Sequence, residues 1–457
     1  MINEQIHKYI QDNKEQILKD YINLLKIPSI SDTDEAKNAL VFIKSLYEEG
    51  GFECDLYEDY LLSHYKNGKK SIGLFAHADV VPVDDKWTVT SPFEPKIVDG
   101  ELFARGSSDD KSAVIISLYA LKILKELNIP FNSSLVCFTG ANEETTMNDI
   151  KNYVKAHTPP DFSLVLDAGF PLHYGDKGIL WLLLSFNERE FDDLVDFNGG
   201  GIYNIIVGEA TATVKYSDKL YNELSENKSI QINKNDNLIE IYAKGISNHG
   251  AVPYGSINAG GIILEALCKA QSFNQNDKEK LQLPLKLLTT YDGDTLHIKS
   301  RDDIYRDTTV TNGIVKTENG QLKLSLDIRY GSTFTQNSLI EKMKEVFDKE
   351  QITFEIAKTG EPRHTDINNK YLNICLEAYR KHTGDINAAP KISAGGTYLR
   401  YLPNVIETGM TTKYYGCNLP NGHGGAHQPN EHINIEGFFE ALEIIVKMLI
   451  ECDKSDN

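Results

Sequence analysis

The sequence predicts an α/β fold with a largely parallel sheet, into which a second domain of α+β character is inserted. In the first part of the chain, short runs rich in β-forming residues (71–76, 134–138 and 163–166) alternate with helical patterns (111–127 and 147–157). Strands that alternate with helices are typical of parallel sheets. The chain has 457 residues, more than the roughly 250–300 at which a single core stops growing, so two domains are expected.

The remaining elements follow in order. The first 25 residues carry Ile6, Ile10, Ile17 and Leu25 at helical spacing, which predicts an amphipathic helix. After residue 178, strand-like segments (179–187, 209–216, 238–244 and 322–330) are separated by charged loops such as 222–237, with helical patterns at 259–270 and 337–349. The α/β pattern returns near residue 366 and ends on a helix at 435–451. We therefore expect one domain formed by residues 1–178 and 365–457, with residues 179–364 inserted in it.

The composition excludes several classes of protein. With 47 Lys and Arg against 66 Asp and Glu, the formal net charge is −19, whereas a general nucleic-acid binder needs a basic face. No apolar run approaches the roughly 18 residues of a membrane span, and the N-terminus has no apolar signal core. The six cysteines are scattered without a CxxC pair, which indicates free thiols in a reducing compartment. We expect a cytoplasmic protein that binds neither nucleic acid nor membrane.

Acidic and imidazole side chains follow three predicted strands at the point where each strand ends. His77 and Asp79 follow the first strand, the adjacent Glu143 and Glu144 follow the second, and Asp167 ends the third. In an open α/β sheet, ligands bind outside the carboxyl ends of the strands. An isolated pair of this kind is typical of a solvated surface, but the conjunction of these three strand ends with the Asp109–Asp110 pair at a helix start favours one functional site.

A further acidic pair completes a candidate metal site. Asp109 and Asp110 introduce the helix that begins near residue 111. Imidazole and carboxylate groups suit zinc, manganese or cobalt, and two such cations need about three protein ligands each, with one carboxylate shared. One further histidine would complete the set formed by His77, Asp79, Asp109, Glu144 and Asp167. Glu143 is left over and could serve as the general base for a shared water.

These segments resemble a known family. The runs HADVVP, WTVTSPFEPKIVDGELFARGSSDDKS, NEET and HQPNEHI are similar to those of the zinc peptidases related to carboxypeptidase G, aminoacylase, acetylornithine deacetylase and succinyl-diaminopimelate desuccinylase. Within that family the sequence most resembles the bacterial dipeptidase branch typified by peptidase V. The resemblance covers the chain from its first helix to its last and is weaker in the insertion. It implies a phosphorylase/hydrolase-like zinc-exopeptidase catalytic domain with a mixed, mostly parallel sheet, and an inserted lid domain like the family's dimerisation domain.

The resemblance also assigns roles at the metal site. It implies that His77 and Asp167 bind one metal, that Glu144 and His427 bind the other, and that Asp109 bridges them. Glu143 takes the position of the catalytic base. Asp79 takes the position that orients His77, so it leaves the ligand set, and the Asp109–Asp110 peptide would be cis. The cofactors expected are two divalent ions, zinc first, with manganese or cobalt as alternatives.

One histidine near His427 competes for the role of ligand. His423 lies four residues earlier, a spacing that places two ligands together only on a helix. Gly422, Gly424 and Gly425 make a helix unfavourable here. Only His427 matches the HxxNE position of the family, so His423 is not expected to bind metal.

The resemblance implies further substrate-binding residues. His249 matches a lid histidine that contacts the substrate carbonyl, and Arg329 matches an arginine that binds the substrate carboxylate, a role that suits a planar guanidinium. Asn204 is a candidate for the same pocket. The run SAGGTYLR offers backbone amides and a hydroxyl at Gly395, Gly396 and Thr397.

We therefore expect a metal-dependent dipeptidase that hydrolyses the amide bond of dipeptides with a water bridging two divalent metals. The long insertion resembles the monomeric branch, so a monomer is expected. One alternative is an N-acyl amino-acid deacylase such as a succinyl-diaminopimelate desuccinylase, which would act on an N-acyl amino acid. A non-catalytic metal-dependent peptide-binding protein is a third hypothesis, which Glu143 disfavours because a binder needs no free carboxylate there.

Overall fold

The computed structural model describes residues 2–66, 68–84, 86–186, 191–413, 419–420 and 422–455. The chain forms two compact units: the first comprises Met1–Asp176, His364–Ser393 and Thr397–Asn457, and the second comprises Lys177–Arg363 with Ala394–Gly396. Asn187, which ends one expected strand, and Cys417 lie outside the described residues.

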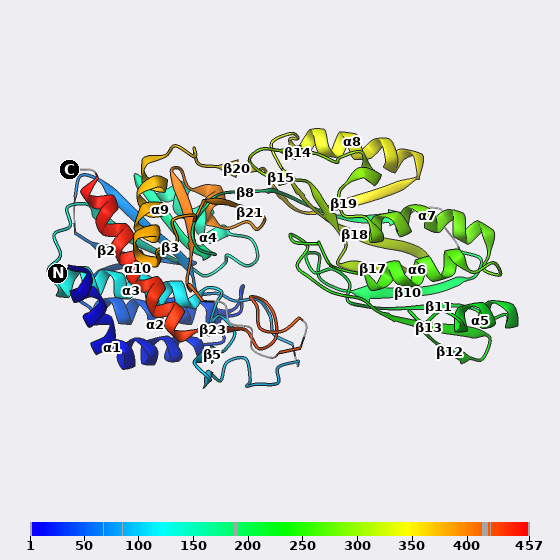
Figure 1. Ribbon diagram of the computed structural model, residues 1–457, viewed down its shortest axis with the longest axis horizontal. Helices are drawn as coiled ribbons and strands as arrows, with labels where there is room; N and C mark the ends of the chain where they lie inside the picture. Colours follow the sequence, from blue (N-terminus) through cyan, green and yellow to red (C-terminus); the bar gives the residue numbers. More distant parts are fainter. Residues whose placement is uncertain are drawn as a thin grey trace. The chain divides into compact units, whose positions relative to one another are not determined.

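The first unit is built on a mixed sheet (Figure 1). Its strand order is β1 (Glu53–Leu56), β2 (Tyr60–Tyr65), β6 (Ser134–Gly140), β3 (Ser71–His77), β7 (Phe162–Ala168), β22 (Val405–Gly409), β8 (His173–Asp176) and β20 (Arg363–His364), with β21 (Lys391–Ser393) paired to β8. The four central strands β6, β3, β7 and β22 run parallel, and β1, β2 and β8 join antiparallel. The expected α/β class with a mostly parallel sheet is confirmed.

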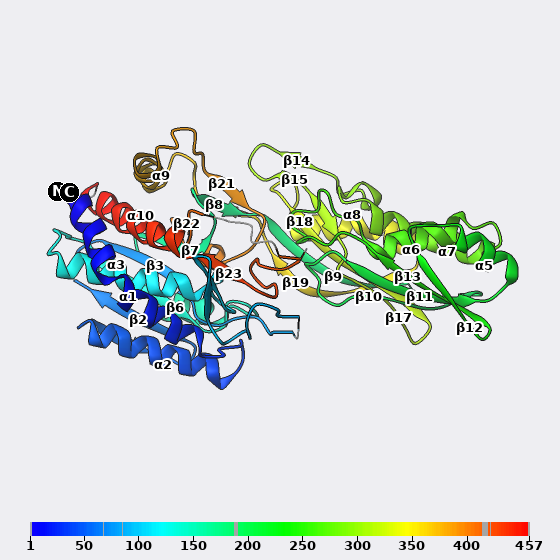
Figure 2. The same cartoon turned by 60° about the horizontal axis from the view of Figure 1, so that its bottom comes forward.

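Helices cover both faces of this sheet. The larger core packs against α1 (Ile2–Leu25), α2 (Asp34–Glu49), α3 (Lys111–Glu126), α9 (Lys370–Thr383) and α10 (Ile435–Lys454), and Figure 2 shows α1, α3 and α10 side by side. On the other face, α4 (Asn148–Ala156) and the turn η2 (Tyr398–Tyr401) enclose a smaller core. Strand β3 serves both cores because its side chains alternate: Ile72 and Leu74 enter the larger one and Phe75 enters the smaller. A separate small sheet joins β4 (Lys96–Val98), β5 (Glu101–Phe103) and β23 (His432–Asn434).

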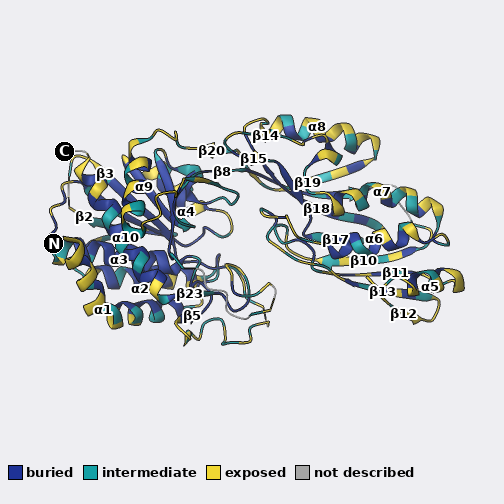
Figure 3. Ribbon diagram, in the orientation of Figure 1, coloured by how far each residue is buried: buried dark blue, intermediate teal, exposed yellow. Residues whose placement is uncertain are grey.

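The second unit is an antiparallel sheet with helices, as the α+β prediction requires. Its strand order is β12 (Gln231–Asn235), β13 (Leu238–Lys244), β11 (Glu209–Lys215), β10 (Leu194–Gly200), β17 (Ile314–Glu318), β18 (Gln321–Tyr330), β9 (Gly178–Phe186) and β19 (Ile352–Gly360), with β16 (Thr309–Thr311) beside β18. Its helices are α5 (Asp218–Ser225), α6 (Ala259–Lys269), α7 (Gln275–Thr289) and α8 (Gln336–Lys349), and the two-residue strands β14 (Arg301–Asp302) and β15 (Arg306–Asp307) pair with each other. Buried and exposed residues alternate along β11 and β13, whose buried side packs on α6 (Figure 3).

One expectation for the second unit is wrong. Residues 222–237 are not a loop, because α5 ends within them and β12 follows. The helix is short and buries only Leu220 and Leu224, and Ser217 caps its first turn. Strand β12 lies at the sheet edge with mostly exposed polar residues, so it lacks the apolar alternation that identifies a strand.

No helix in the described part of the chain is both long and apolar enough to cross a membrane.

Candidate metal centre

Parallel strands place the expected ligands at one edge of the first unit's sheet. In the register of β3 and β6, His77 lies opposite Gly140, so the turn that carries Glu143 and Glu144 begins level with His77. In the register of β3 and β7, Phe75 lies opposite Val165, which puts Asp167 level with His77 on the other side. The strand ends therefore converge, as expected for an open α/β sheet.

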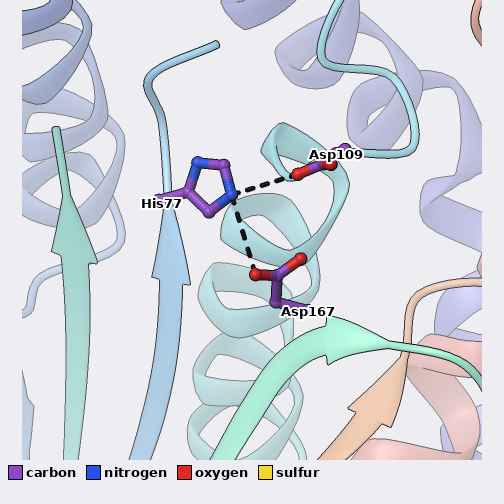
Figure 4. A group of neighbouring side chains, drawn as sticks. All are labelled: His77, Asp109 and Asp167. Carbon is purple, nitrogen blue, oxygen red and sulfur yellow. Dashed lines mark hydrogen bonds and ion pairs between the residues drawn. The ribbon is translucent and has the colours of Figure 1, made fainter. Parts of the chain in front are cut away.

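The first candidate group consists of His77, Asp109 and Asp167 (Figure 4). The Nε2 atom of His77 lies 3.1 Å from Oδ1 of Asp109 and 3.9 Å from Oδ2 of Asp167. The His77 side chain is buried, whereas the two carboxylates are partly accessible. One imidazole nitrogen and two carboxylate oxygens thus face a common point.

The second candidate group consists of Asp109, Glu144 and His427. The Nε2 atom of His427 lies 3.0 Å from Oδ2 of Asp109 and 3.0 Å from Oε2 of Glu144. Asp109 therefore directs Oδ1 to the first group and Oδ2 to the second. The described residues thus bring all five expected ligands together around one shared carboxylate.

Asp79 belongs to neither group and instead supports them. Its Oδ1 accepts a hydrogen bond from the backbone N–H of Glu143 at 3.1 Å, and its Oδ2 accepts from Glu144 N at 3.2 Å and Ser31 Oγ at 2.5 Å. The Nδ1 atom of His77 lies 3.0 Å from the backbone oxygen of Asp79 and 3.5 Å from its carboxylate. This one side chain therefore fixes the Glu143–Glu144 turn and lies behind His77, which leaves Nε2 of the ring for the first group.

The electrostatics of both groups suit a cation. Burial alone lowers the pKa of His77, but hydrogen bonds to Asp109 and Asp79 hold that pKa well above its ordinary value. His427 behaves likewise, because Glu144 and Asp109 raise its pKa against the effect of burial. Burial and the neighbouring Asp109 carboxylate also raise the pKa of Asp167. The carboxylates beside His77 and His427 thus keep protons on the two imidazoles. A divalent cation that replaces those protons therefore meets a favourable electrostatic field.

The donor chemistry gives a second test of fit. Each group offers one imidazole nitrogen and two carboxylate oxygens, the ligand types preferred by zinc, manganese and cobalt. The buried Oε1 atom of Glu144 has no hydrogen-bond partner among the described residues. A buried carboxylate oxygen needs a donor or a cation, so these residues fit two divalent ions. The Asp109–Asp110 peptide is cis, as the family resemblance implies.

His423 lies outside both groups found among the described residues. Its Nδ1 is 2.8 Å from the side-chain amide of Asn430, whose oxygen accepts from the backbone N–H groups of Thr88 and Val89. His423 thus helps to anchor the 88–89 loop.

A cavity of about 710 Å³ in the first unit adjoins these ligands. Asp109 and Asp167 line one part of it, and Met410, Lys413 and Ile433 line another. Its volume lies within the range of sites for small molecules, roughly 300–1,000 Å³.

The second unit brings together several of the expected substrate-binding residues. The side-chain amide of Asn204 lies 3.3 Å from Nε2 of His249, and Nδ1 of His249 accepts a hydrogen bond from Ala251 N at 3.2 Å. Both ring nitrogens therefore face N–H donors, and a neutral imidazole can accept through only one of them. The contacts with Asn204 and Ala251 hold the position of the ring.

Arg329 is held more firmly than the sequence suggested. Its Nε and Nη2 donate to the Asp327 carboxylate at 2.7 and 3.0 Å, and its Nη1 donates to the backbone oxygen of Ala394 at 2.8 Å. A guanidinium has five N–H groups. Within the described contacts, one N–H on each Nη atom is left for a substrate carboxylate, so Arg329 would bind it through its outer edge.

The SAGGTYLR run is divided between the two units. Gly395 and Gly396 group with the second unit, next to the Ala394 oxygen that accepts from Arg329. Thr397 groups with the first unit, where its hydroxyl donates to the buried Glu407 and accepts from Leu399 N at 3.2 Å. The Thr397 hydroxyl is thus engaged in a cap.

Several supporting residues were missed from the sequence. Asp327 precedes Arg329 by two residues on one strand, a spacing that puts both on the same side and could have indicated the pair. Glu431 lies in the run HQPNEHI, and in the structure it accepts a hydrogen bond from Arg105. No local pattern in the sequence links these two residues.

Comparisons with known proteins agree with this geometry. Residues 73–451 match the model of Peptidase family M20/M25/M40. Proteins named "Putative dipeptidase" from Staphylococcus saprophyticus and Staphylococcus epidermidis are each 26% identical over 469 residues, which covers 96% of this chain and 97% of theirs.

Solved structures share the fold across the whole chain. Human carnosine dipeptidase 1 aligns with a TM-score of 0.62 at 14% identity, over 99% of each chain. The di-peptidase Dug1p of Saccharomyces cerevisiae aligns with a TM-score of 0.60 at 15% identity, over 100% of this chain and 99% of that one. The Bacillus subtilis YXEP protein, titled a dinuclear metal binding peptidase, aligns with a TM-score of 0.55 at 11% identity, over 97% and 99%. With its strand-end ligands and a family match over most of its length, this chain belongs to Peptidase family M20/M25/M40.

Proposed function

We propose that this peptidase is a metal-dependent dipeptidase that uses two divalent ions, with zinc as the native metal. The observation that carries the proposal is the Asp109 carboxylate shared between two imidazole-carboxylate groups, with Glu143 beside them. The names of the staphylococcal relatives and of carnosine dipeptidase 1 and Dug1p support a dipeptide substrate.

Two bound divalent ions would polarise the scissile carbonyl and lower the pKa of the attacking water. Glu143 accepts the proton of that water and returns it to the leaving amine. Its position follows from Asp79, which fixes the backbone of both Glu143 and Glu144. Glu143 thus transfers the proton, while its neighbour Glu144 binds a cation.

The family resemblance supports roles for His249 and Arg329 in binding the rest of the substrate. His249, next to Asn204, donates a ring N–H to the oxygen that becomes negatively charged as the carbonyl is attacked. Arg329 binds the C-terminal carboxylate of the dipeptide beside Gly395 and Gly396. The long insertion supports a monomer as the active species.

Metal analysis tests the metal centre. The purified protein is expected to contain about two divalent ions per chain and to lose activity with a chelator. Plasma emission spectroscopy measures the content, and re-addition of zinc should restore turnover. Full activity with one ion or none would contradict the two-metal proposal.

A substrate panel tests the dipeptide proposal. Asp327 already neutralises Arg329, so removing the substrate carboxylate by amidation should cost about 2 kcal/mol, the lower end for a buried pair, or roughly 30-fold in kcat/KM. Arg329→Met should abolish most of this preference while the metals remain bound. Faster turnover of N-acetyl or N-succinyl amino acids than of any dipeptide would overturn the proposal in favour of a deacylase. Equal cleavage of free and amidated dipeptides would remove Arg329 from it.

A further inference from the structure

A buried carboxylate, Glu431, joins the two segments that carry the shared metal ligand and the second histidine. Its side chain is fully buried. Its Oε1 accepts from the backbone N–H groups of Ser108 at 2.8 Å and Asp109 at 3.0 Å, and from Ser108 Oγ at 3.1 Å. Its Oε2 accepts from Gly106 N at 3.1 Å and from Arg105 Nη1 at 2.7 Å. Arg105, Gly106, Ser108 and Asp109 are thus all hydrogen-bonded to one side chain.

Arg105 extends this connection to His427. Its Nη1 donates to Glu431 and its Nη2 donates to the backbone oxygen of His427 at 3.2 Å. His427 has a φ of 63°, in the left-handed region that residues other than glycine rarely adopt. Such a backbone persists where its surroundings hold it in place. Arg105 therefore helps to fix the conformation that presents the His427 ring.

We propose that Glu431 is a positioning residue that fixes Asp109 relative to His427 and thereby sets the affinity of the metal position that these two share with Glu144. This inference rests on the two-metal function proposed above. Glu431 lies in neither group of candidate ligands found among the described residues, so its effect is exerted through the ligands. Residues that orient metal ligands typically change metal affinity by about 10–100-fold when they are altered.

The contacts imply an unequal effect on the two positions. In the group formed by Asp109, Glu144 and His427, two of three ligands are connected to Glu431. In the group formed by His77, Asp109 and Asp167, only Asp109 is connected, and His77 is supported separately through Asp79. Loss of Glu431 should therefore weaken the second group more than the first.

Glu431→Gln tests this without changing the size of the side chain. The Glu431 carboxylate accepts five hydrogen bonds. The amide of a glutamine would place an N–H group against some of these donors, so the 105–109 loop must shift. Metal-free protein would be titrated with zinc by calorimetry. Wild type should show two tight equivalents, and the variant should show one, with the other weakened by about 10–100-fold. The titration should resemble that of His427→Ala, in which the same position is removed, and excess zinc should restore turnover of the glutamine variant alone.

Asp453→Asn provides a matched control. This carboxylate is also buried, and it accepts from Asn132 N, Ser133 N and Ser133 Oγ in a loop distant in sequence. Loss of its charge should lower the stability of the fold in a similar way. Asp453 belongs to neither group of candidate ligands found among the described residues, so both zinc equivalents should remain tight.

Arg105→Lys extends the test to the case in which Glu431→Gln does not fold. Lysine keeps a positive charge near Glu431 but cannot donate to both Glu431 and His427 from one planar group. Arg105→Lys should also lower the zinc affinity of the position formed by Asp109, Glu144 and His427 selectively. When cobalt(II) replaces zinc, the absorption spectrum should change for the ion at that position alone. Two tight equivalents in both foldable variants, or an equal loss in Asp453→Asn, would overturn the inference. Wild type with fewer than two equivalents would instead refute the proposed function.

Discussion

Two adjacent carboxylates, Glu143 and Glu144, have different proposed roles although they are residues of one type. Both backbone N–H groups bind Asp79, yet only Glu144 has its carboxylate 3.0 Å from His427. The difference arises because successive side chains of the turn point in different directions from one fixed backbone. The direction of each side chain therefore supports the different roles proposed for Glu143 and Glu144.

Substitution of each residue should separate the two roles. Glu143→Gln should keep both metals but lower kcat by at least roughly 10²–10⁴-fold, as expected for loss of a general base. Glu144→Gln should lose metal, because it removes charge from a ligand. Metal content and kcat measured on the same samples check this. Equal metal loss in both variants, with equal residual rates, would mean that the roles are wrongly assigned.

Asp149 should make the fold more stable in mild acid. Burial raises its pKa to about 7, even though Asn142 N, Ile150 N and Tyr398 Oη donate to it. Between the ordinary aspartate pKa near 4 and about 7, the unfolded chain is ionised while the folded chain keeps the proton. This group's contribution to stability is therefore largest at low pH and falls by up to about 1.4 kcal/mol per pH unit as the pH rises through that window.

Asp149→Asn removes this titration. The difference in unfolding free energy between wild type and the variant, measured with chelator from pH 4.5 to 7.5, should change with pH in the direction given above. Other titrating groups are common to both proteins and cancel in the difference. A difference that is constant across the window would show that Asp149 is ionised in the folded state.

Among the elements, the loop that carries His249 depends on a close contact at Gly250. A Cβ added there would lie 2.5 Å from Thr311 Oγ1 and 2.7 Å from the Asp327 carboxylate that binds Arg329. The loop therefore packs directly on the Asp327–Arg329 pair, and Gly250 N also donates to Asn204 O at 2.7 Å. The packing at Gly250 therefore links His249, Asn204 and Arg329, which are all proposed to bind the substrate.

Gly250→Ala should displace this loop. We expect kcat/KM for dipeptides to fall by about 10-fold or more while both metals stay bound, because the ligands lie in the other unit. Gly201→Ala is the control, since an added Cβ there meets nothing within 4 Å. Dipeptide kinetics and metal analysis of both variants check this. An unchanged kcat/KM in Gly250→Ala would show that the loop position does not affect catalysis.

For the molecule as a whole, metal binding should be coupled to proton release. The pKa values of His77 and His427 are held well above the ordinary value by the carboxylates that outweigh burial. A protonated imidazole cannot bind a metal, so each ligand must lose its proton. Protonation of these rings stabilises the metal-free fold at low pH, and that contribution disappears as the pH rises through the raised pKa values. Zinc affinity should therefore increase with pH.

Calorimetric titration in buffers of different ionisation enthalpy measures the protons released. We expect net release per metal at pH 6–7, and a difference in Tm between metal-loaded and metal-free protein that grows toward pH 8. Binding with no proton release at pH 6 would contradict the raised pKa values.

The sequence by itself determined much of this protein. The alternation of strands and helices identified the α/β class, because the spacing of apolar residues is local information. His77, Glu144 and Asp167 could be named because parallel strands end at one edge of a sheet, so side chains that follow three strands must meet there. Asp109 could be named from its place before the helix at residue 111, whereas its bridging role and the choice of His427 came from resemblance to the family. Edge strand β12 was missed because its side chains are mostly exposed and show no periodicity.

Only the tertiary structure decided how these residues divide their contacts. Asp109 directs one oxygen to each group because His77 and His427 approach it from elements far apart in the chain. Glu431 contacts the 105–109 loop across more than 320 residues, a pairing that no local pattern encodes. Arg329 was expected to bind a substrate carboxylate, and the structure adds that Asp327 and Ala394 accept hydrogen bonds from its guanidinium. Apart from the Asp327–Arg329 pair within one strand, these contacts depend on packing between distant segments, so they are fixed when the chain folds.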